Sequence, residues 1–225
     1  MRFIRYFSMT ERIIWCVSVA AVLTVFLIFD KVNRLYPISA IIGVSYIILN
    51  AKGNPFGQVL GLVFSVCYGF ISYGFGYYGE MLTYLGMTAP MAVWALVAWL
   101  RHPYKGNRAE VAVNRIKAAE MLFAFILSAV VAVLFYFPLK HFNTANLLPS
   151  TLSVMTSFLA VYLTARRSEW FSLAYAANDV VLIVLWSLAA LENSSYCSEL
   201  VCFCAFLIND IYAFVSWRRM RKRQS

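Results

Sequence analysis

The sequence consists mostly of apolar blocks of about 20 residues, separated by short polar segments. A block of this length lets an α-helix cross a hydrocarbon core about 30 Å thick. Hydrophobic residues make up 62% of the 225 residues and charged residues 13%, whereas soluble domains average about half apolar and about a quarter charged. The pattern predicts an all-α membrane protein without a separate soluble domain.

We expect eight transmembrane helices. The second expected helix is short and contains a glycine, so it is the weakest of the eight. The first follows a basic stretch but has no cleavage motif typical of a signal peptide, so we expect it to be retained. The expected helices are residues 13–29, 36–50, 55–76, 78–100, 119–138, 147–165, 169–190 and 196–217.

The basic residues indicate how these helices are oriented. With eight crossings, sixteen of the 19 Lys and Arg residues fall on one side, and only Lys31, Arg34 and Lys140 fall on the other. Lys and Arg favour cytoplasmic loops, so both termini are expected in the cytoplasm. Because the net charge of +9 lies in these loops, it indicates the lipid bilayer as a partner and does not indicate nucleic acid.

Two parts of the chain resemble each other. Residues 77–101 overlay residues 195–219 at an offset of 118, and Phe56 overlays Trp170 at an offset of 114. The matched pairs at the offset of 118 are Tyr78 and Tyr196, Leu82 and Leu200, Trp94 and Tyr212, Trp99 and Trp217, and Arg101 and Arg219. Partial overlap of two aromatic-rich helices by chance is the alternative. The interpretation as an internal repeat predicts two parallel three-helix bundles, an architecture in which transporters hold substrate near the midplane.

The expected organisation has five parts. They are an N-terminal cytoplasmic segment with one extra helix (1–35), the first three-helix bundle (36–100), a cytoplasmic loop with a linker helix (101–146), the second three-helix bundle (147–217) and a cytoplasmic basic tail (218–225). This is one extra helix followed by a 3+1+3 arrangement.

Polar residues near the centres of apolar helices are candidates for a binding site, since ionisable groups in a bilayer usually face the protein interior or a watery cavity. Asn178 and Asp179 lie in one such helix, and Asn209 and Asp210 in another. Aromatic rings beside amide and carboxyl groups suit a flat heterocyclic ligand, and a carboxylate can also face a cationic ring. The alternative is that these groups only bond neighbouring helices to one another. Further candidates are Tyr175, Trp186, Gln58, Tyr68, Tyr73, Tyr84 and Trp94.

Other function classes find little support. The sequence has no phosphate-binding GxxxxGK[ST] loop, and both histidines, His102 and His141, fall in expected loops. We therefore expect no metal, no cofactor and no enzymatic activity. An intramembrane aspartyl protease using Asp179 and Asp210, which would share a proton, is the alternative from a different class, although neither aspartate has the GxGD context of those enzymes.

Long stretches of the chain resemble the PnuC-type nicotinamide riboside transporters. NPFGQVLGLVFSVCYGFISYGFGYYGEMLTYLGMTAPMAVWALVAWLRHP is similar to the first half of that family, and EWFSLAYAANDVVLIVLW with FLINDIYAFVSW is similar to its last two helices. The features that carry the resemblance are Asn54, Gly61, Tyr68, the YYGE turn at 77–80, Pro90, Met91, Trp94 and Trp99. The resemblance covers about residues 36–219.

The resemblance implies a 3+1+3 fold related to the SWEET sugar transporters, commonly a homotrimer in a bacterial inner membrane. It implies uptake of nicotinamide riboside by facilitated diffusion, followed by phosphorylation by a cytoplasmic kinase. It also implies a substrate site at Asn178, Trp186, Asn209 and Tyr212, with Tyr175 where the family often has Trp.

This chain departs from the family pattern at several positions. Ser172 and Tyr175 occupy the places of a frequent WxxW motif, and Ala92 stands where the family often has Gln. These positions leave the substrate open between nicotinamide riboside and another nucleoside-like molecule, such as a deoxynucleoside, thiamine or riboflavin.

Overall fold

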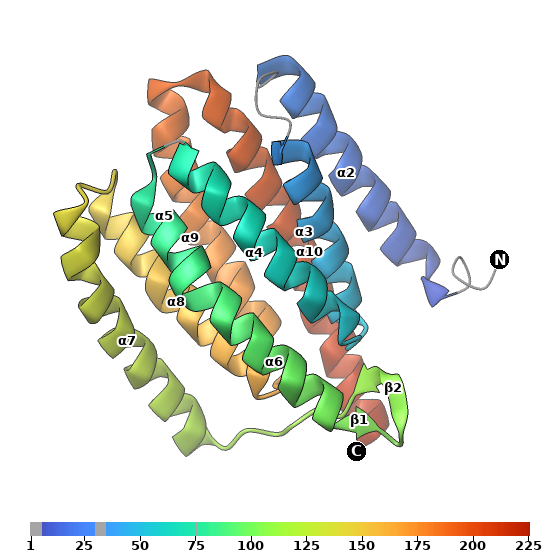
Figure 1. Ribbon diagram of the computed structural model, residues 1–225. Helices are drawn as coiled ribbons and strands as arrows, with labels where there is room; N and C mark the ends of the chain where they lie inside the picture. Colours follow the sequence, from blue (N-terminus) through green and yellow to red (C-terminus); the bar gives the residue numbers. More distant parts are fainter. Residues whose placement is uncertain (1–5, 30–34, 75) are drawn as a thin grey trace.

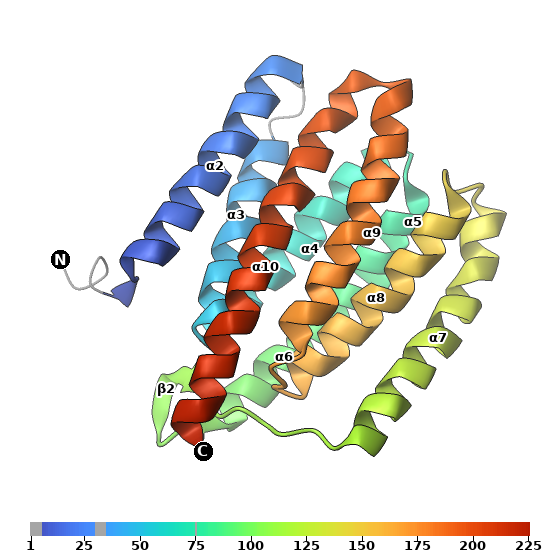
Figure 2. The same cartoon turned by 180° about the vertical axis from the view of Figure 1, so that it is seen from behind.

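The computed structural model describes residues 6–29, 35–74 and 76–225. Their long elements are all helices, which run side by side in alternating directions (Figures 1 and 2). The helices are α2 (Met9–Phe29), α3 (Leu35–Ala51), α4 (Phe56–Gly74), α5 (Tyr78–Thr83), the π-helical turn η1 (Tyr84–Thr88), α6 (Ala89–Arg101), α7 (Ala118–His141), α8 (Leu147–Ala165), α9 (Phe171–Glu192), the short 3₁₀ turn η2 (Ser194–Tyr196) and α10 (Cys197–Gln224). The predicted all-α membrane class is confirmed.

Seven of the helical stretches within the described residues are long and apolar enough to cross a membrane, and α5, η1 and α6 together form one of them. The eighth, α3, has 17 residues. A helix of that length spans only about 25 Å. The expected number of apolar helices is therefore present, and the complete crossing of the bilayer by α3 stays a prediction.

Six helices form a closed ring. In order of contact they are α3, α4, α6, α8, α9 and α10, with α10 returning to α3. Outside the ring, α2 packs against α3 and α10, and α7 packs against α8 (Figures 1 and 2). Both outer helices expose large apolar side chains over most of their surface, as expected for helices that face lipid.

The turns that follow α3 and α8 have the same hydrogen bonds at an offset of 114. Gly53 N–H donates to Asn50 O, and Arg167 N–H donates to Thr164 O. Asn54 N–H donates to Leu49 O, just as Ser168 N–H donates to Leu163 O. Gly53 and Arg167 also share positive φ angles, 66° and 57°.

Two tryptophans join the ring at the same end. Trp99 Nε1–H in α6 donates to Thr164 O at 2.8 Å, and Trp217 Nε1–H in α10 donates to Asn50 O at 2.7 Å. The two indole rings also contact each other, with centroids 5.4 Å apart. Trp99 therefore joins α6 to α8, and Trp217 joins α10 to α3.

The structure differs from the sequence-based expectation at this end of the bundle. The loop after α6 contains a hairpin of β1 (Pro103–Tyr104) and β2 (Asn107–Val111), and α10 continues as a helix through residues 218–224 instead of ending at 217. The extension is held in place because Arg218 and Arg221 pair with the buried carboxylate of Glu169, and Arg223 pairs with Glu110 of β2. Such long-range ion pairs give no periodic signal in a sequence.

Candidate functional site

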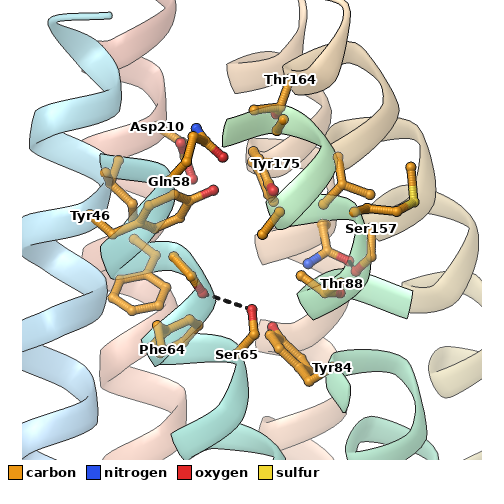
Figure 3. A pocket seen from close by; sticks show the side chains of 18 of the residues that line it. Tyr46, Gln58, Phe64, Ser65, Tyr84, Thr88, Ser157, Thr164, Tyr175 and Asp210 are labelled. Carbon is orange, nitrogen blue, oxygen red and sulfur yellow. Dashed lines mark hydrogen bonds between the residues drawn. The ribbon is translucent and has the colours of Figure 1, made fainter. Parts of the chain in front are cut away.

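A cavity of about 40 Å³ lies inside the ring of helices (Figure 3). Its walls combine aromatic rings with amide, hydroxyl and carboxyl groups. Six of the candidate residues line it, namely Gln58, Tyr84, Tyr175, Asn178, Asp179 and Asp210. The structure therefore brings together candidates from α4, η1, α9 and α10.

Asn178 is held in place by hydroxyl groups from α8. Thr156 Oγ and Ser157 Oγ donate to Asn178 Oδ1 at 2.8 and 2.9 Å. With its oxygen occupied in this way, the side-chain amide keeps its N–H₂ group as a donor. Asn178 is 3% exposed and faces the cavity, so this donor is available to a ligand there.

Asp179 and Asp210 meet in the wall of the cavity. Their carboxyl groups are close enough to hydrogen-bond to each other, and their side chains are 3% and 4% exposed. An ionised carboxylate can only accept hydrogen bonds, so a direct bond between two carboxyl groups requires a proton on one of them. Within the described part of the chain, Asp179 Oδ2 is buried without a hydrogen-bond partner.

Tyr46 and Tyr175 form the aromatic part of the wall nearest these acids. Their rings meet edge to face, with centroids 6.4 Å apart. Gly61 makes room for Tyr46, because a Cβ added at Gly61 would lie 2.7 Å from Tyr46 Cε2. Phe64 and Tyr84 line the cavity on another side, with their ring centroids 6.0 Å apart (Figure 3).

Gln58 is buried in α4 and is oriented by α3. Its Nε2 donates to Asn50 Oδ1 at 2.8 Å, which leaves its side-chain oxygen as an acceptor. Gln58 in α4 and Asn178 in α9 thus offer an acceptor and a donor from different helices of the cavity wall. A ligand with both kinds of polar group could bond to both.

Two predicted residues of α10 lie away from the cavity and face α2 instead. Asn209 Nδ2 donates to Ser18 Oγ at 2.8 Å, and the Tyr212 hydroxyl donates to Glu11 Oε1 at 3.2 Å. Neighbouring helical residues point about 100° apart, so Asn209 turns to α2 when Asp210 faces the cavity. A direct substrate role for Asn209 and Tyr212 stays a prediction that this conformation does not favour.

Three other predicted residues also lie outside the cavity lining. Trp186 of α9 packs on Tyr77, the residue before α5, with ring centroids 4.6 Å apart. Trp94 is 45% exposed and contacts Tyr162. Tyr68 packs between Phe64, Tyr84 and Phe203. For these three as well, binding to substrate stays a prediction.

Several lining residues were not singled out from the sequence. Ser157 and Thr164 come from α8, Thr88 from the π-helical turn, Ser65 from α4 and Tyr46 from α3. A signal existed in α8, where Ser150, Ser153, Ser157 and Thr164 follow a helical period in an apolar segment and are all buried. Such a hydroxyl stripe indicates a helix face turned to other helices and not to lipid.

Comparison with known proteins decides the class of protein. The sequence model of the nicotinamide mononucleotide transporter family matches residues 33–219. The chain belongs to this transporter family. Membership confirms the resemblance seen in the sequence and the expectation of a transporter and not an enzyme. The contact between Asp179 and Asp210 would by itself also have suited an aspartyl protease.

The chain is similar to two curated bacterial relatives and one solved structure. It is 25% identical over 217 residues to the nicotinamide riboside transporter PnuC of Neisseria mucosa, covering 94% of this chain and 82% of the relative. It is 22% identical over 191 residues to the protein of the same name in Haemophilus influenzae, covering 83% and 80%. A crystal structure of the vitamin B3 transporter PnuC has the same fold, with a TM-score of 0.85, 22% identity and coverage of 97% and 94%.

Proposed function

We propose that this protein takes up nicotinamide riboside by facilitated diffusion and binds it in the central cavity near the membrane midplane. The cavity carries this proposal, since residues from both expected three-helix groups, α3 to α6 and α8 to α10, line it with aromatic rings and with amide and carboxyl groups. Membership of a transporter family and the names of the two relatives support the substrate.

The chemistry of the cavity favours the riboside over the mononucleotide. The two differ by a phosphate group, which proteins bind with Arg, Lys or the N–H groups of a helix terminus. None of the described residues that line the cavity is Lys, Arg or His, and two of them are carboxylic acids. A phosphate placed there would face acidic groups and no basic side chain.

The size of the cavity indicates that transport requires movement. Sites for drug-sized ligands measure about 300–1,000 Å³, and this cavity measures about 40 Å³. We propose alternating access between the two three-helix groups. Opening toward one side separates Trp99 from Trp217, and opening toward the other separates Tyr77 from Trp186.

We further propose that the two groups are parallel repeats in a 3+1+3 arrangement. In support, the turns after α3 and α8 share their hydrogen bonds at an offset of 114, and Trp99 and Trp217 make equivalent contacts at an offset of 118. The ring contacts fit the same pairing, because α10 touches α3 just as α6 touches α8. Between the groups, α7 restores the chain direction.

The placement of charge supports an orientation with both termini in the cytoplasm of a bacterial inner membrane. Most described Lys and Arg residues gather at the end of the bundle that holds the start of α2, the hairpin and the end of α10 (Figure 1). Such residues favour the cytoplasmic side. Assembly as a homotrimer is a further proposal, which rests on the resemblance alone.

Uptake by purified protein in liposomes tests the proposal. Labelled nicotinamide riboside should equilibrate across the membrane without ATP or an ion gradient, and should not accumulate above the outside concentration. Deoxynucleosides, thiamine and riboflavin serve as unlabelled competitors to test the alternative substrates. Absence of riboside flux in vesicles that contain folded protein would contradict the proposal.

A further inference from the structure

Uncharged polar side chains are enough to bind a neutral sugar or amide, but the cavity wall also contains two acidic residues, Asp179 and Asp210. Both side chains are almost completely buried and contact each other, and Asp179 Oδ2 lacks a hydrogen-bond partner within the described residues. Burying an ionised group without a partner inside a bilayer is costly. A cationic ligand in the cavity would give this pair a counterpart that its described lining does not provide.

The charge of the cavity follows from its described lining. Two carboxyl groups that share a hydrogen bond hold at least one proton, so the pair carries at most one negative charge. Among the lining residues that the structure describes, no Lys, Arg or His compensates this charge. Tyr46 and Tyr175 stand beside the pair, and their π-faces also attract cations.

All of this acidity comes from one three-helix group. At the offsets of the repeat, Ser65 in α4 corresponds to Asp179, and Ala92 in α6 corresponds to Asp210. All four residues line the cavity. One wall is therefore acidic while its counterpart is neutral, so a ligand with a charged end and a neutral polar end has a preferred orientation.

We infer that Asp179 and Asp210 make the cavity select a ligand with a permanently cationic aromatic ring over the same ligand with a neutral ring. This inference rests on the proposed function. Nicotinamide riboside has such a ring, because its glycosidic bond to the ring nitrogen creates a pyridinium cation. Its reduced form keeps the ribose and the amide but has a neutral dihydropyridine ring. The two forms thus differ mainly in charge.

The charge of each alternative substrate predicts how strongly it competes with nicotinamide riboside. Thiamine carries a cationic thiazolium ring and should compete, whereas riboflavin and deoxynucleosides are neutral and should compete weakly. Asn178 presents its amide N–H₂ group to any of these ligands, so it does not discriminate by charge. Discrimination by charge therefore falls to the two aspartates.

The experiment is a competition assay in proteoliposomes at zero membrane potential, set with valinomycin and equal potassium on both sides. Under these conditions the charge of a substrate does not itself drive its movement. Exchange of labelled nicotinamide riboside is measured against unlabelled riboside and against its reduced form. We expect the cationic form to compete at least about tenfold more strongly, because a buried charge that loses its partner is strongly destabilised.

The variants Asp179→Asn and Asp210→Asn each replace a carboxyl group by an amide of similar shape. We expect the preference for the cationic form to fall toward unity in both. Glu110→Gln is the matched control, since it removes one carboxylate from the hairpin outside the cavity. Its preference should equal that of the unmodified protein.

The outcomes separate the two proposals. If the unmodified protein exchanges neither form, the proposed function fails. If it exchanges both and they compete equally, the function stands and the charge selection is wrong. If either folded Asn variant retains the full preference, selection does not depend on that aspartate and the inference is overturned. If a variant does not fold, as judged by size-exclusion chromatography, the competition ratio of the unmodified protein still decides.

Discussion

The two three-helix groups of the proposed 3+1+3 arrangement, α3 to α6 and α8 to α10, share backbone contacts but differ in the side chains that line the cavity. At the offset of 114, the turns after α3 and α8 repeat the same backbone hydrogen bonds. The cavity positions in the same helices do not match, because Phe64 and Ser65 of α4 stand where α9 has Asn178 and Asp179. The comparison teaches that contacts which hold the helices together recur in both groups, while both carboxyl groups of the cavity wall come from one of them.

The third helix of each group differs as well. In the first group it is interrupted by the π-helical turn η1, which places Tyr84 and Thr88 in the cavity wall, and Pro90 follows just after. In the second group, α10 runs without interruption and contributes Asp210. Since π-turns widen a helix locally and often occur at functional sites, the third helix of the first group changes the shape of the cavity wall. The third helix of the second group contributes a carboxyl group to that wall.

The largest expected effect comes from removing the amide of the second group. Asn178→Leu should lower riboside uptake by at least about tenfold, because Ser157 loses its acceptor and the ligand loses a donor. The corresponding change in the first group, Phe64→Leu, should lower uptake only about twofold. Initial uptake rates in liposomes measure both. Equal losses would mean that the two groups contribute alike.

A smaller effect on riboside binding is expected from substitution of Gly61, a glycine of the first group. Gly61 corresponds to Tyr175, and Gly61→Ala would force the Tyr46 ring out of its place, since the added Cβ lies 2.7 Å from it. We expect a loss of about 1–3 kcal/mol in stability and a lower affinity for the riboside, measured by thermal unfolding in detergent with and without ligand. Gly74→Ala is the control, because nothing lies within 4 Å of its added Cβ.

Substitution of the two tryptophans tests whether their equivalent contacts also contribute equally to the stability of the protein. Trp99→Phe and Trp217→Phe each remove one buried hydrogen bond to a carbonyl that keeps a second donor. Each should therefore cost about 1 kcal/mol plus the lost packing, and the two losses should be similar. Unfolding in detergent measures them, and losses that differ several-fold would show that the equivalence is only geometric.

The smallest effect concerns the two turns. Gly53 and Arg167 share a left-handed backbone, which costs about 1–2 kcal/mol for a residue other than glycine. Arg167→Gly relieves this strain but adds freedom to the unfolded chain, so stability should change by less than about 1 kcal/mol. Gly53→Ala introduces the strain and should destabilise. If Gly53→Ala is neutral, the two turns are not under the same constraint.

Part of the binding site could be predicted from the sequence. Asp179, Asp210 and Asn178 stand out because polar side chains are rare in apolar helices, and the cost of burying them places them inside the bundle. Tyr46 and Ser157 could not be distinguished from many similar residues, because aromatic and hydroxyl side chains are common throughout the chain. The sequence of α10 also does not tell which of its faces meets the cavity, so it could not distinguish Asn209, which faces α2, from Asp210, which lines the cavity.

The sequence by itself determined the class of protein, the order of its helices and the polar residues that must be buried. It did so because a bilayer imposes a fixed length on each crossing and a high cost on each buried charge. Only the tertiary structure decided which of those polar residues meet. The direction of a side chain around the helix axis depends on how the helices pack, and this packing turns Asp210 toward Asp179 and turns Asn209 toward Ser18.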